Sequence, residues 1–142
     1  MERLTIPQTL DEWNERGQEY LPGLLGIRIL EVGPDMLRAR MKVERRKCAW
    51  NGYLHAGAVV SLADTCCGYA TVRSLPEGAA GFTTIELKSN FFGTALEGDV
   101  GCSARPVHKG RTTQVWDAEV TAEASGKRIA QFRCTQMILY PR

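Results

Sequence analysis

The sequence predicts an α+β fold in which an antiparallel sheet of about six strands is wrapped around one long central helix. Residues 55–75 carry apolar side chains on almost every side, which is typical of a helix that is buried all round. Two strand-like runs precede this segment and four follow it, with turn residues between them. A sheet with one face to bury and a helix with every face to bury are both satisfied if the sheet curves around the helix.

The chain before the central helix is predicted to form a short helix followed by two strands. Thr9 and Glu12 have the spacing of a capping box at the start of that short helix. Its apolar stripe consists of Leu10, Trp13 and Tyr20. Its end is indicated by Pro22 and Gly23. The two strands are expected near residues 26–32 and 36–43, joined by a turn, and a loop over 44–54 leads into the central helix.

Four closely spaced strands are predicted after the central helix, which ends near Pro76 and Gly78. They are expected near residues 82–92, 100–108, 114–123 and 128–140. Turn residues at 109–110 and 125–126 indicate hairpins and therefore antiparallel pairing. Small residues on the sheet face toward the helix permit close approach, and these are Ala104, Ala118 and Ala130.

Length and composition favour a single domain over residues 1–142, with residues 1–23 as an N-terminal helical extension. Hydrophobic residues make up 44% of the chain, which suits a packed core, and a net charge of +2 is too small to indicate nucleic acid as a partner. The most apolar stretch, residues 56–72, contains Asp64, so no membrane span is expected.

The N-terminus lacks the apolar run of a signal peptide, so we expect a cytoplasmic protein. The five cysteines then belong to a reducing compartment, where disulfides are rare. Their spacing suits no zinc site, and each is expected to be a buried small hydrophobic residue. No metal is therefore expected.

Asp64 is the only charged residue between Lys47 and Arg73 and the only acidic residue of the central helix. Aspartate is a poor helix former, and an unpaired carboxylate is costly to bury. A buried partner or a solvent-facing patch of helix would explain it in structural terms. Because perturbed carboxylates gather at active sites, we favour a catalytic role for Asp64.

The run from Asn51 to Gly57 places glycines and a short loop directly before the central helix. Free backbone N–H groups at a helix start, together with the helix dipole, suit a carbonyl oxygen that gains negative charge. The alternative is an ordinary helix start with glycines for turning. Asp64 follows Ala56 by eight residues, which is about 12 Å along the helix axis.

This separation has a consequence for assembly, because one carbonyl group cannot touch both Ala56 and Asp64 of the same chain. If both act on one substrate, the acid of one chain must face the helix start of another. Two antiparallel helices in a two-fold dimer meet this condition and give two equal sites. We expect a homodimer with shared active sites, assembled further into a homotetramer whose second interface has no signature in the sequence.

The run Leu54–Thr65, LHAGAVVSLADT, resembles the His-Gly-Gly…Asp signature of hotdog-fold thioesterases of the phenylacetate-degradation type. The runs Thr84–Phe91 and Val107–Arg111 resemble the strand and the hairpin that follow in that family. The resemblance implies the hotdog fold and hydrolysis of an acyl-CoA thioester to a carboxylic acid and free CoA. It implies no cofactor, since CoA is part of the substrate.

The resemblance also implies roles for individual residues. Asp64 would act as the nucleophile or as the general base. The backbone N–H of Ala56, where the family usually has Gly, would polarise the thioester carbonyl. Gly57 matches the second Gly of the signature, and His55 matches its His, which shapes the loop more often than it takes part in the chemistry.

A helper amide that is common in the family is missing from its usual place. Relatives often carry Asn or Gln six residues before the signature His, and here that position is Ala49. Asn51 is near and either replaces the amide or is only a turn residue.

The phosphates of CoA require cationic partners, and the sequence offers several. The candidates are Arg105, Lys109 and Arg111 around one hairpin, with Lys88 and Arg73 as weaker ones. A solvated hairpin with no ligand is the alternative.

Two other functions remain open alongside hydrolysis. A hotdog-fold hydratase or dehydratase pairs an acid with a catalytic His in an arrangement that neither His55 nor His108 follows. A non-catalytic acyl-CoA binding or sensing module would bind the same ligand without turnover. The acyl group itself is not specified, since aromatic, short and medium chains are all compatible with the sequence.

Overall fold

The computed structural model describes residues 1–142, and it confirms the predicted order of helices and strands. The helices are α1 (Leu10–Arg16), α2 (Leu21–Leu24), the 3-10 helix η1 (Arg45–Lys47) and α3 (Ala56–Arg73). The strands are β1 (Arg28–Val32), β2 (Leu37–Lys42), β3 (Gly81–Phe91), β4 (Asp99–Lys109), β5 (Thr113–Ala122) and β6 (Lys127–Leu139).

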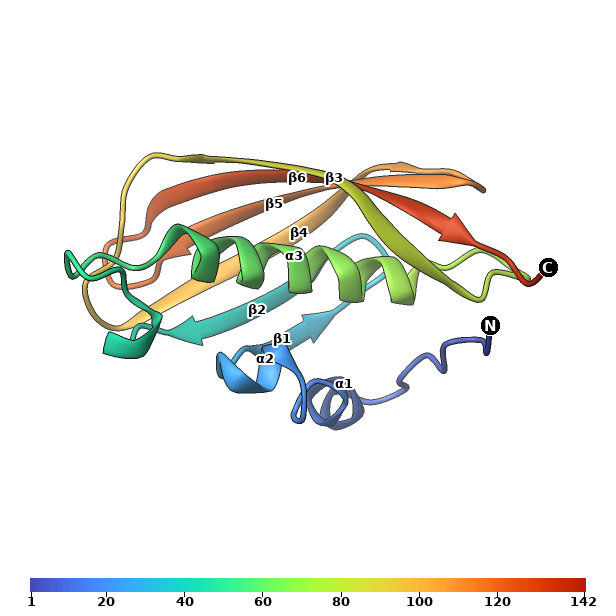
Figure 1. Cartoon of the computed structure of the whole chain (residues 1–142), viewed down its shortest axis with the longest axis horizontal. Coiled ribbons are helices and arrows are strands. Elements are labelled where there is room, and N and C mark those ends of the chain that lie inside the picture. Colours follow the sequence, from blue (N-terminus) through green and yellow to red (C-terminus); the bar gives the residue numbers. More distant parts are fainter.

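The six strands form one antiparallel sheet in the order β1-β2-β4-β5-β6-β3. Figure 1 shows this sheet curving over one side of α3, which runs along it. The helix packs mainly against β2, β4 and β5. A curved antiparallel sheet around a central helix is the hotdog fold, so the predicted fold class is confirmed.

The side of α3 that faces the sheet is fully buried, and the other side is not. The buried residues are Ala58, Val59, Leu62, Ala63, Cys66, Cys67, Gly68, Ala70 and Thr71. On the opposite side Gly57 is exposed, while Val60, Ser61 and Asp64 are half-buried. The expectation of a helix buried all round is therefore wrong for a single chain, because one layer of sheet covers only one side of the helix.

The inner face of the sheet carries the small residues that were predicted there. Ala104, Ala118 and Ala130 are each at most 1% exposed, so their methyl groups let α3 approach the sheet closely. Trp116 and Phe132 fill the space beside them, and the Trp116 indole N–H donates to Gln114 Oε1 at 2.9 Å.

Four of the five cysteines are buried in this core, as predicted: Cys66, Cys67, Cys102 and Cys134. Burial raises the pKa of the Cys67 thiol well above its ordinary value. A thiol with a raised pKa stays protonated and is a poor nucleophile, which fits a packing role. Cys48 is only half-buried, so the prediction of a buried thiol is wrong at that position.

The capping box predicted for the first helix is present in part. The Thr9 hydroxyl accepts from the backbone N–H of Glu12 at 3.2 Å. The Glu12 carboxylate accepts from the N–H of Gln8 at 2.6 Å, one residue before the usual partner. These bonds fix the start of α1, which Figure 1 shows below α3 on the side opposite β3.

The end of the first helix differs from the prediction. Gly17 is the C-cap of α1, and Pro22 lies in the first turn of α2. Proline suits a helix start because its missing N–H has no partner there. Tyr20 lies outside α1 and is exposed, and of the predicted stripe only Trp13 is buried, with its ring 5.6 Å from that of Tyr69 in α3.

β3 is an edge strand of the sheet, and its free edge carries apolar side chains. Ile85, Leu87 and Phe91 are 52%, 45% and 45% exposed. Leu87 and Phe91 pair in register with the buried residues Cys134 and Ala130, so they lie on the inner face but beyond the reach of α3.

None of the helices combines the length and the hydropathy needed to cross a membrane.

Candidate active site

The start of α3 is organised by His55, the N-cap residue. Its Nδ1 atom accepts a hydrogen bond from the backbone N–H of Gly57 at 2.8 Å. A Cβ atom at Gly57 would lie 2.9 Å from that nitrogen, so glycine leaves room for the imidazole to cap the helix. Ala56 is exposed, and its N–H has no acceptor within the chain. The donor that remains free at this helix start is therefore the one at Ala56.

Asp64 lies two turns further along α3 and is half-buried. Its Oδ1 atom is buried without a hydrogen-bond partner, and no cation of the chain pairs with the carboxylate. Burial raises the pKa of Asp64 above its ordinary value of 3.8. Of the two structural explanations for this acid, a buried partner is absent within the chain, whereas a solvent-facing patch of helix is present, because Asp64 is half-buried on the open side of α3. Its carboxylate keeps free lone pairs that are available for chemistry.

Asp64 belongs to a stripe of small and polar residues on the open side of α3. Gly57, Ser61 and Asp64 follow one another at helical spacing, and the buried Gly68 continues this spacing toward β3. The Ser61 hydroxyl donates to the carbonyl oxygen of Gly57 at 2.8 Å, so it is already engaged. At Gly68 a Cβ atom would lie 3.3 Å from the ring of Phe82, which shows that β3 contacts the helix one turn beyond Asp64.

The sequence analysis did not single out Gly68, and it gave Phe82 only as an aromatic residue that lines a pocket or fills the core. A glycine inside a buried helix indicates close approach of another element, and this signal was present in the sequence. The sequence did not indicate which residue approaches the glycine, because β3 comes to lie beside α3 only through the order of strands in the sheet.

The part of the chain that carries Ala56 and Asp64 also matches a known family. Residues 51–129, more than half of the chain, match the family model described as the thioesterase superfamily. The chain belongs to the thioesterase superfamily. This confirms the family resemblance inferred from the helix signature.

Relatives of this thioesterase superfamily member cover most of its length. The 1,4-dihydroxy-2-naphthoyl-CoA hydrolase of Escherichia coli (strain K12) is 34% identical over 131 residues, which is 92% of this chain and 95% of that protein. The putative esterase ComA2 of Bacillus subtilis (strain 168) is 33% identical over 115 residues, 81% of this chain and 90% of that protein.

Solved structures of thioesterases have the same fold. A thioesterase from Haemophilus influenzae superposes with a TM-score of 0.88 at 29% identity, covering 94% of this chain and 92% of that chain. A variant of a Pseudomonas aeruginosa thioesterase, in which a glutamine is replaced by alanine, also gives a TM-score of 0.88 at 29% identity, covering 98% and 99%. These relatives support thioester hydrolysis as the general chemistry of this chain.

In this thioesterase superfamily member the loop before α3 is held by Asn51. The side-chain oxygen of Asn51 accepts from the backbone N–H of Tyr53 at 3.2 Å, which is an Asx turn. This favours the turn interpretation of Asn51 over the helper-amide interpretation. Ala49 lies in the same loop, where its N–H donates to the carbonyl oxygen of Tyr53 at 2.8 Å and its methyl group offers no polar contact.

Two of the cations predicted to bind CoA lie at the turn between β4 and β5, and both have intramolecular partners. The Lys109 ammonium is 2.7 Å from the Asp35 carboxylate and 3.0 Å from the carbonyl oxygen of Pro34. The Arg111 guanidinium lies 5.3 Å from the ring centroid of Tyr140. Both contacts compete with a phosphate for these side chains.

Arg105 and Lys88 lie elsewhere, on the outer face of the sheet. Arg105 on β4 pairs in register with Asp117 on β5, and Lys88 on β3 pairs with Arg133 on β6. The Arg133 guanidinium binds the Asp117 carboxylate at 2.6 Å. The structure therefore divides the predicted cationic cluster into a cross-strand row and a separate turn.

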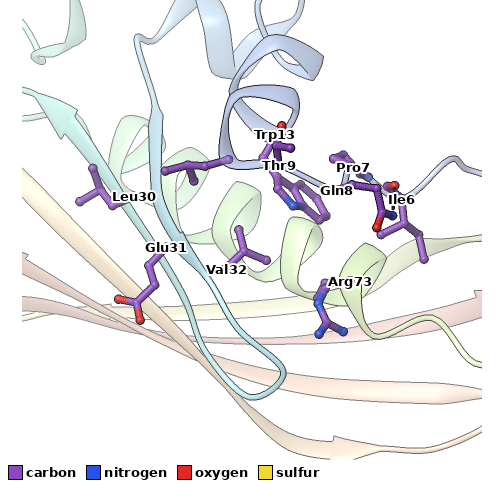
Figure 2. Close-up of a pocket in the computed structure, with 10 residues that line it drawn as sticks. Ile6, Pro7, Gln8, Thr9, Trp13, Leu30, Glu31, Val32 and Arg73 are labelled. Carbon is purple, nitrogen blue, oxygen red and sulfur yellow. Dashed lines mark hydrogen bonds between the residues drawn. The ribbon is translucent and has the colours of Figure 1, made fainter.

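Arg73, which with Lys88 was a weaker candidate, is at the C-terminal end of α3 and far from the helix start. It lines a hollow of about 540 Å³ between β1 and the N-terminal segment, shown in Figure 2 with Trp13 and Val32. Neither Asp64 nor Ala56 lines this hollow. No three His, Cys, Asp or Glu side chains come together in a group that could hold a metal ion.

Proposed function

We propose that this protein hydrolyses an acyl-CoA thioester to a carboxylic acid and free CoA, with Asp64 as the catalytic carboxylate and the Ala56 N–H as the oxyanion donor. The observation that carries the proposal is the Asp64 carboxylate, which is half-buried on the open side of α3 with one oxygen lacking any partner. A buried carboxylate oxygen without a hydrogen-bond partner is costly to fold stability.

The chemistry has two possible first steps, and both use the same two groups. In one, an oxygen of Asp64 attacks the thioester carbon, the C–S bond breaks, and water then hydrolyses the resulting anhydride. In the other, Asp64 takes a proton from a water whose oxygen attacks the same carbon. In both routes the CoA sulfur leaves with the electron pair and gains a proton, while the Ala56 N–H stabilises the oxygen that becomes negative.

The site requires a second copy of the chain, and the free edge of the sheet suits one. Two β3 strands that pair antiparallel about a two-fold axis would extend the sheet and cover Ile85, Leu87 and Phe91. The same axis places the two α3 helices antiparallel, so Asp64 of one copy approaches the helix start of the other. A homotetramer would need a further interface, for which the outer sheet face is available.

The substrate class is supported by the Escherichia coli relative, whose name describes a CoA thioester of an aromatic acid. We therefore place aromatic acyl groups first among the candidates and keep short and medium chains as alternatives. Free thiols in the core are consistent with a cytoplasmic location, where acyl-CoA is made and used.

The test is release of free thiol from a set of acyl-CoA thioesters, including 1,4-dihydroxy-2-naphthoyl-CoA, by the wild type and by Asp64→Asn. We expect the variant to lose at least about a hundredfold in kcat for the preferred substrate. Asp11→Asn, an exposed carboxylate on α1, is the matched control and should keep wild-type rates. Equal rates for wild type and Asp64→Asn would contradict the assignment, and tight binding without any hydrolysis would identify a binding module.

A further inference from the structure

Only two residues bury side-chain polar atoms that have no hydrogen-bond partner within the chain. They are Asp64, through its Oδ1 atom, and Gln136, through both the nitrogen and the oxygen of its amide. Gln136 is 0% exposed, so bulk water does not reach this amide. An unpartnered amide is costly to bury, and such a group therefore calls for a partner or a function. The two residues belong to α3 and β6, which contact each other.

The register of the sheet places Gln136 on the inner face, beneath α3. It pairs with Thr84 of β3 on one side and with Gln114 of β5 on the other. Cys134, the preceding inner residue of β6, lies against Cys67 of α3. The side chain of Gln136 therefore lies in the layer between the sheet and the second half of the helix.

The same part of the sheet approaches Asp64. Phe82 of β3 contacts the helix at Gly68, where a Cβ atom would lie 3.3 Å from the Phe82 ring. Figure 1 shows β3 running back along α3 in the opposite direction. The two residues from Phe82 to Thr84 span about 7 Å of strand, and the turn from Gly68 back to Asp64 spans about 6 Å of helix in the same direction. The register pair of Thr84 and Gln136 therefore lies at the level of Asp64.

The carboxylate of Asp64 has an inner and an outer side. Asp64 is half-buried on the open side of α3, but its Oδ1 atom is fully covered. Glu86 and Lys88 on β3 and Arg133 on β6 lie on the outer face of the sheet, and the inner face of β6 offers the Cys134 thiol and no charged group. Burial is the cause that raises the pKa of Asp64, with no contribution from another charge. The covered oxygen is therefore held by no ion and by no hydrogen bond of the chain.

We propose that Gln136 binds an ordered water molecule that hydrogen-bonds the covered oxygen of Asp64, and that this water positions the carboxylate for the reaction. The water accepts from the amide nitrogen of Gln136 and donates to Asp64 Oδ1. A bridging water joins polar atoms that are about 5 Å apart, which is too far for a direct bond. The proposal rests on the proposed function, because it assigns a positioning residue to the same carboxylate.

The bridge has two effects on Asp64. Holding the covered oxygen restrains rotation of the carboxylate, so its other oxygen stays directed to the open side of α3, where the thioester binds in the proposed mechanism. A hydrogen bond to the ionised form also favours that form, and it opposes the burial that raises the pKa of Asp64. Gln136 acts through the water and touches neither the thioester nor the reacting atoms.

A high-resolution crystal structure of the wild-type protein tests the bridge directly. We expect one water within about 2.7–3.2 Å of both Gln136 Nε2 and Asp64 Oδ1. Electron density that shows no water in contact with both atoms would overturn the inference. This test needs no variant and no substrate.

A pair of buried glutamines gives a matched kinetic test. Gln136→Met removes the amide at similar size, so kcat should fall about tenfold. The acidic limb of the pH–rate profile should move to higher pH, because the ionised carboxylate loses a donor. Gln114→Met is the control, since Gln114 donates to the carbonyl oxygen of Ser74 at 2.9 Å and accepts from the Trp116 indole at 2.9 Å. The control should lower the Tm and leave the acidic limb in place.

An acidic limb at the wild-type position in Gln136→Met would contradict the positioning role. A merely structural glutamine would behave as Gln114 does, with a lower Tm and an unchanged limb. The limb therefore separates positioning from packing.

Unfolding in urea tests the link between the two residues without turnover. At pH 7, Gln136→Met should lower the midpoint of the wild type, because the covered oxygen of Asp64 loses its donor. The same substitution in an Asp64→Ala background should not lower the midpoint, since no carboxylate remains there. Equal effects in the two backgrounds would show that the residues are not coupled, and the inference would be lost.

The two proposals fail in different ways. Hydrolysis that is lost in Asp64→Asn, together with an unshifted acidic limb in Gln136→Met, would keep the thioesterase and overturn the positioning role. Coupling between Gln136 and Asp64 in a protein that hydrolyses no thioester would support the bridge and contradict the catalytic proposal. If Gln136→Met does not fold, the crystal structure of the wild type decides the inference by itself.

Discussion

The imidazole Nδ1 of His55 accepts the hydrogen bond of the Gly57 N–H at 2.8 Å, and this occupies the second amide of the helix start. The bond makes His55 a helix cap and leaves Ala56 with the free donor. We therefore expect His55→Asn to keep most of the activity, because Asn is among the best N-cap residues. His55→Ala should lose about 1 kcal/mol of stability together with part of the activity.

Thermal unfolding and thiol-release rates of the two variants separate a cap from a catalytic base. If both variants lost activity to the same extent while the Tm of His55→Asn stayed at the wild-type value, the imidazole would have a chemical role instead.

Ala56→Pro removes the proposed oxyanion donor with little change to the backbone. Proline is favoured at the first helical position, and His55 already has the extended conformation (φ −64°, ψ 134°) that a residue before proline adopts. We expect a loss of about a hundredfold or more in kcat with a nearly unchanged Tm, measured by thiol release and thermal unfolding. A variant with wild-type kcat would show that this amide does not contact the reacting carbonyl.

Mixed oligomers test whether each site is shared between two chains. Asp64→Asn and Ala56→Pro are each expected to be inactive alone. Their heterodimer contains one site with both native groups, so unfolding and refolding an equimolar mixture should restore about a quarter of wild-type activity. Sites confined to one chain would give no recovery at all.

Several features of the fold and the site could be predicted from the sequence because they depend on local pattern. The apolar run gave the position of α3, and Asp64 was recognisable as the single acid within it. The alternating strands gave the buried face of β5 and of β6, with Trp116 and Phe132 fully covered.

Features that depend on contacts between distant segments could not be predicted in this way. Lys109 pairs with Asp35, which is 74 residues earlier in the chain, so a cation assigned to phosphate from spacing alone was already engaged. The open side of α3 could not be predicted either, because an apolar helix has the same sequence pattern whether the sheet or a second chain covers it. Pro22 indicates a helix boundary in sequence, but it marks the start of α2, whereas α1 already ends before Gly17.

The free energy of unfolding should depend on pH because the Asp64 carboxylate is partly buried. Burial raises the pKa of Asp64 in the folded chain above its ordinary value of 3.8, so the folded state disfavours the charged form. The resulting cost is present in full above the folded pKa and vanishes as pH falls below the unfolded value. Asp64→Asn should therefore raise the Tm at pH 7 and leave it unchanged near pH 3, as measured by thermal unfolding.

The same titration governs catalysis in the opposite sense. Both proposed routes need the ionised carboxylate, so kcat should fall as pH drops through the raised pKa of Asp64. A pH–rate profile with no acidic limb would contradict this role. A Tm difference between wild type and Asp64→Asn that is independent of pH would show that the carboxylate is not the source of the instability.

Ala49 offers a gain-of-function test. The position is half-buried in the hairpin before α3, and relatives often carry an amide there, which can donate a hydrogen bond near the thioester or the attacking water. Ala49→Gln should raise kcat, by about tenfold, which is less than the effect of a complete oxyanion donor because the Ala56 amide is already in place. Ala49→Leu has a similar size without the amide and should give no increase. If both substitutions changed kcat equally, the effect would come from packing in the hairpin, and the loss of the helper amide would have no bearing on the rate of this protein.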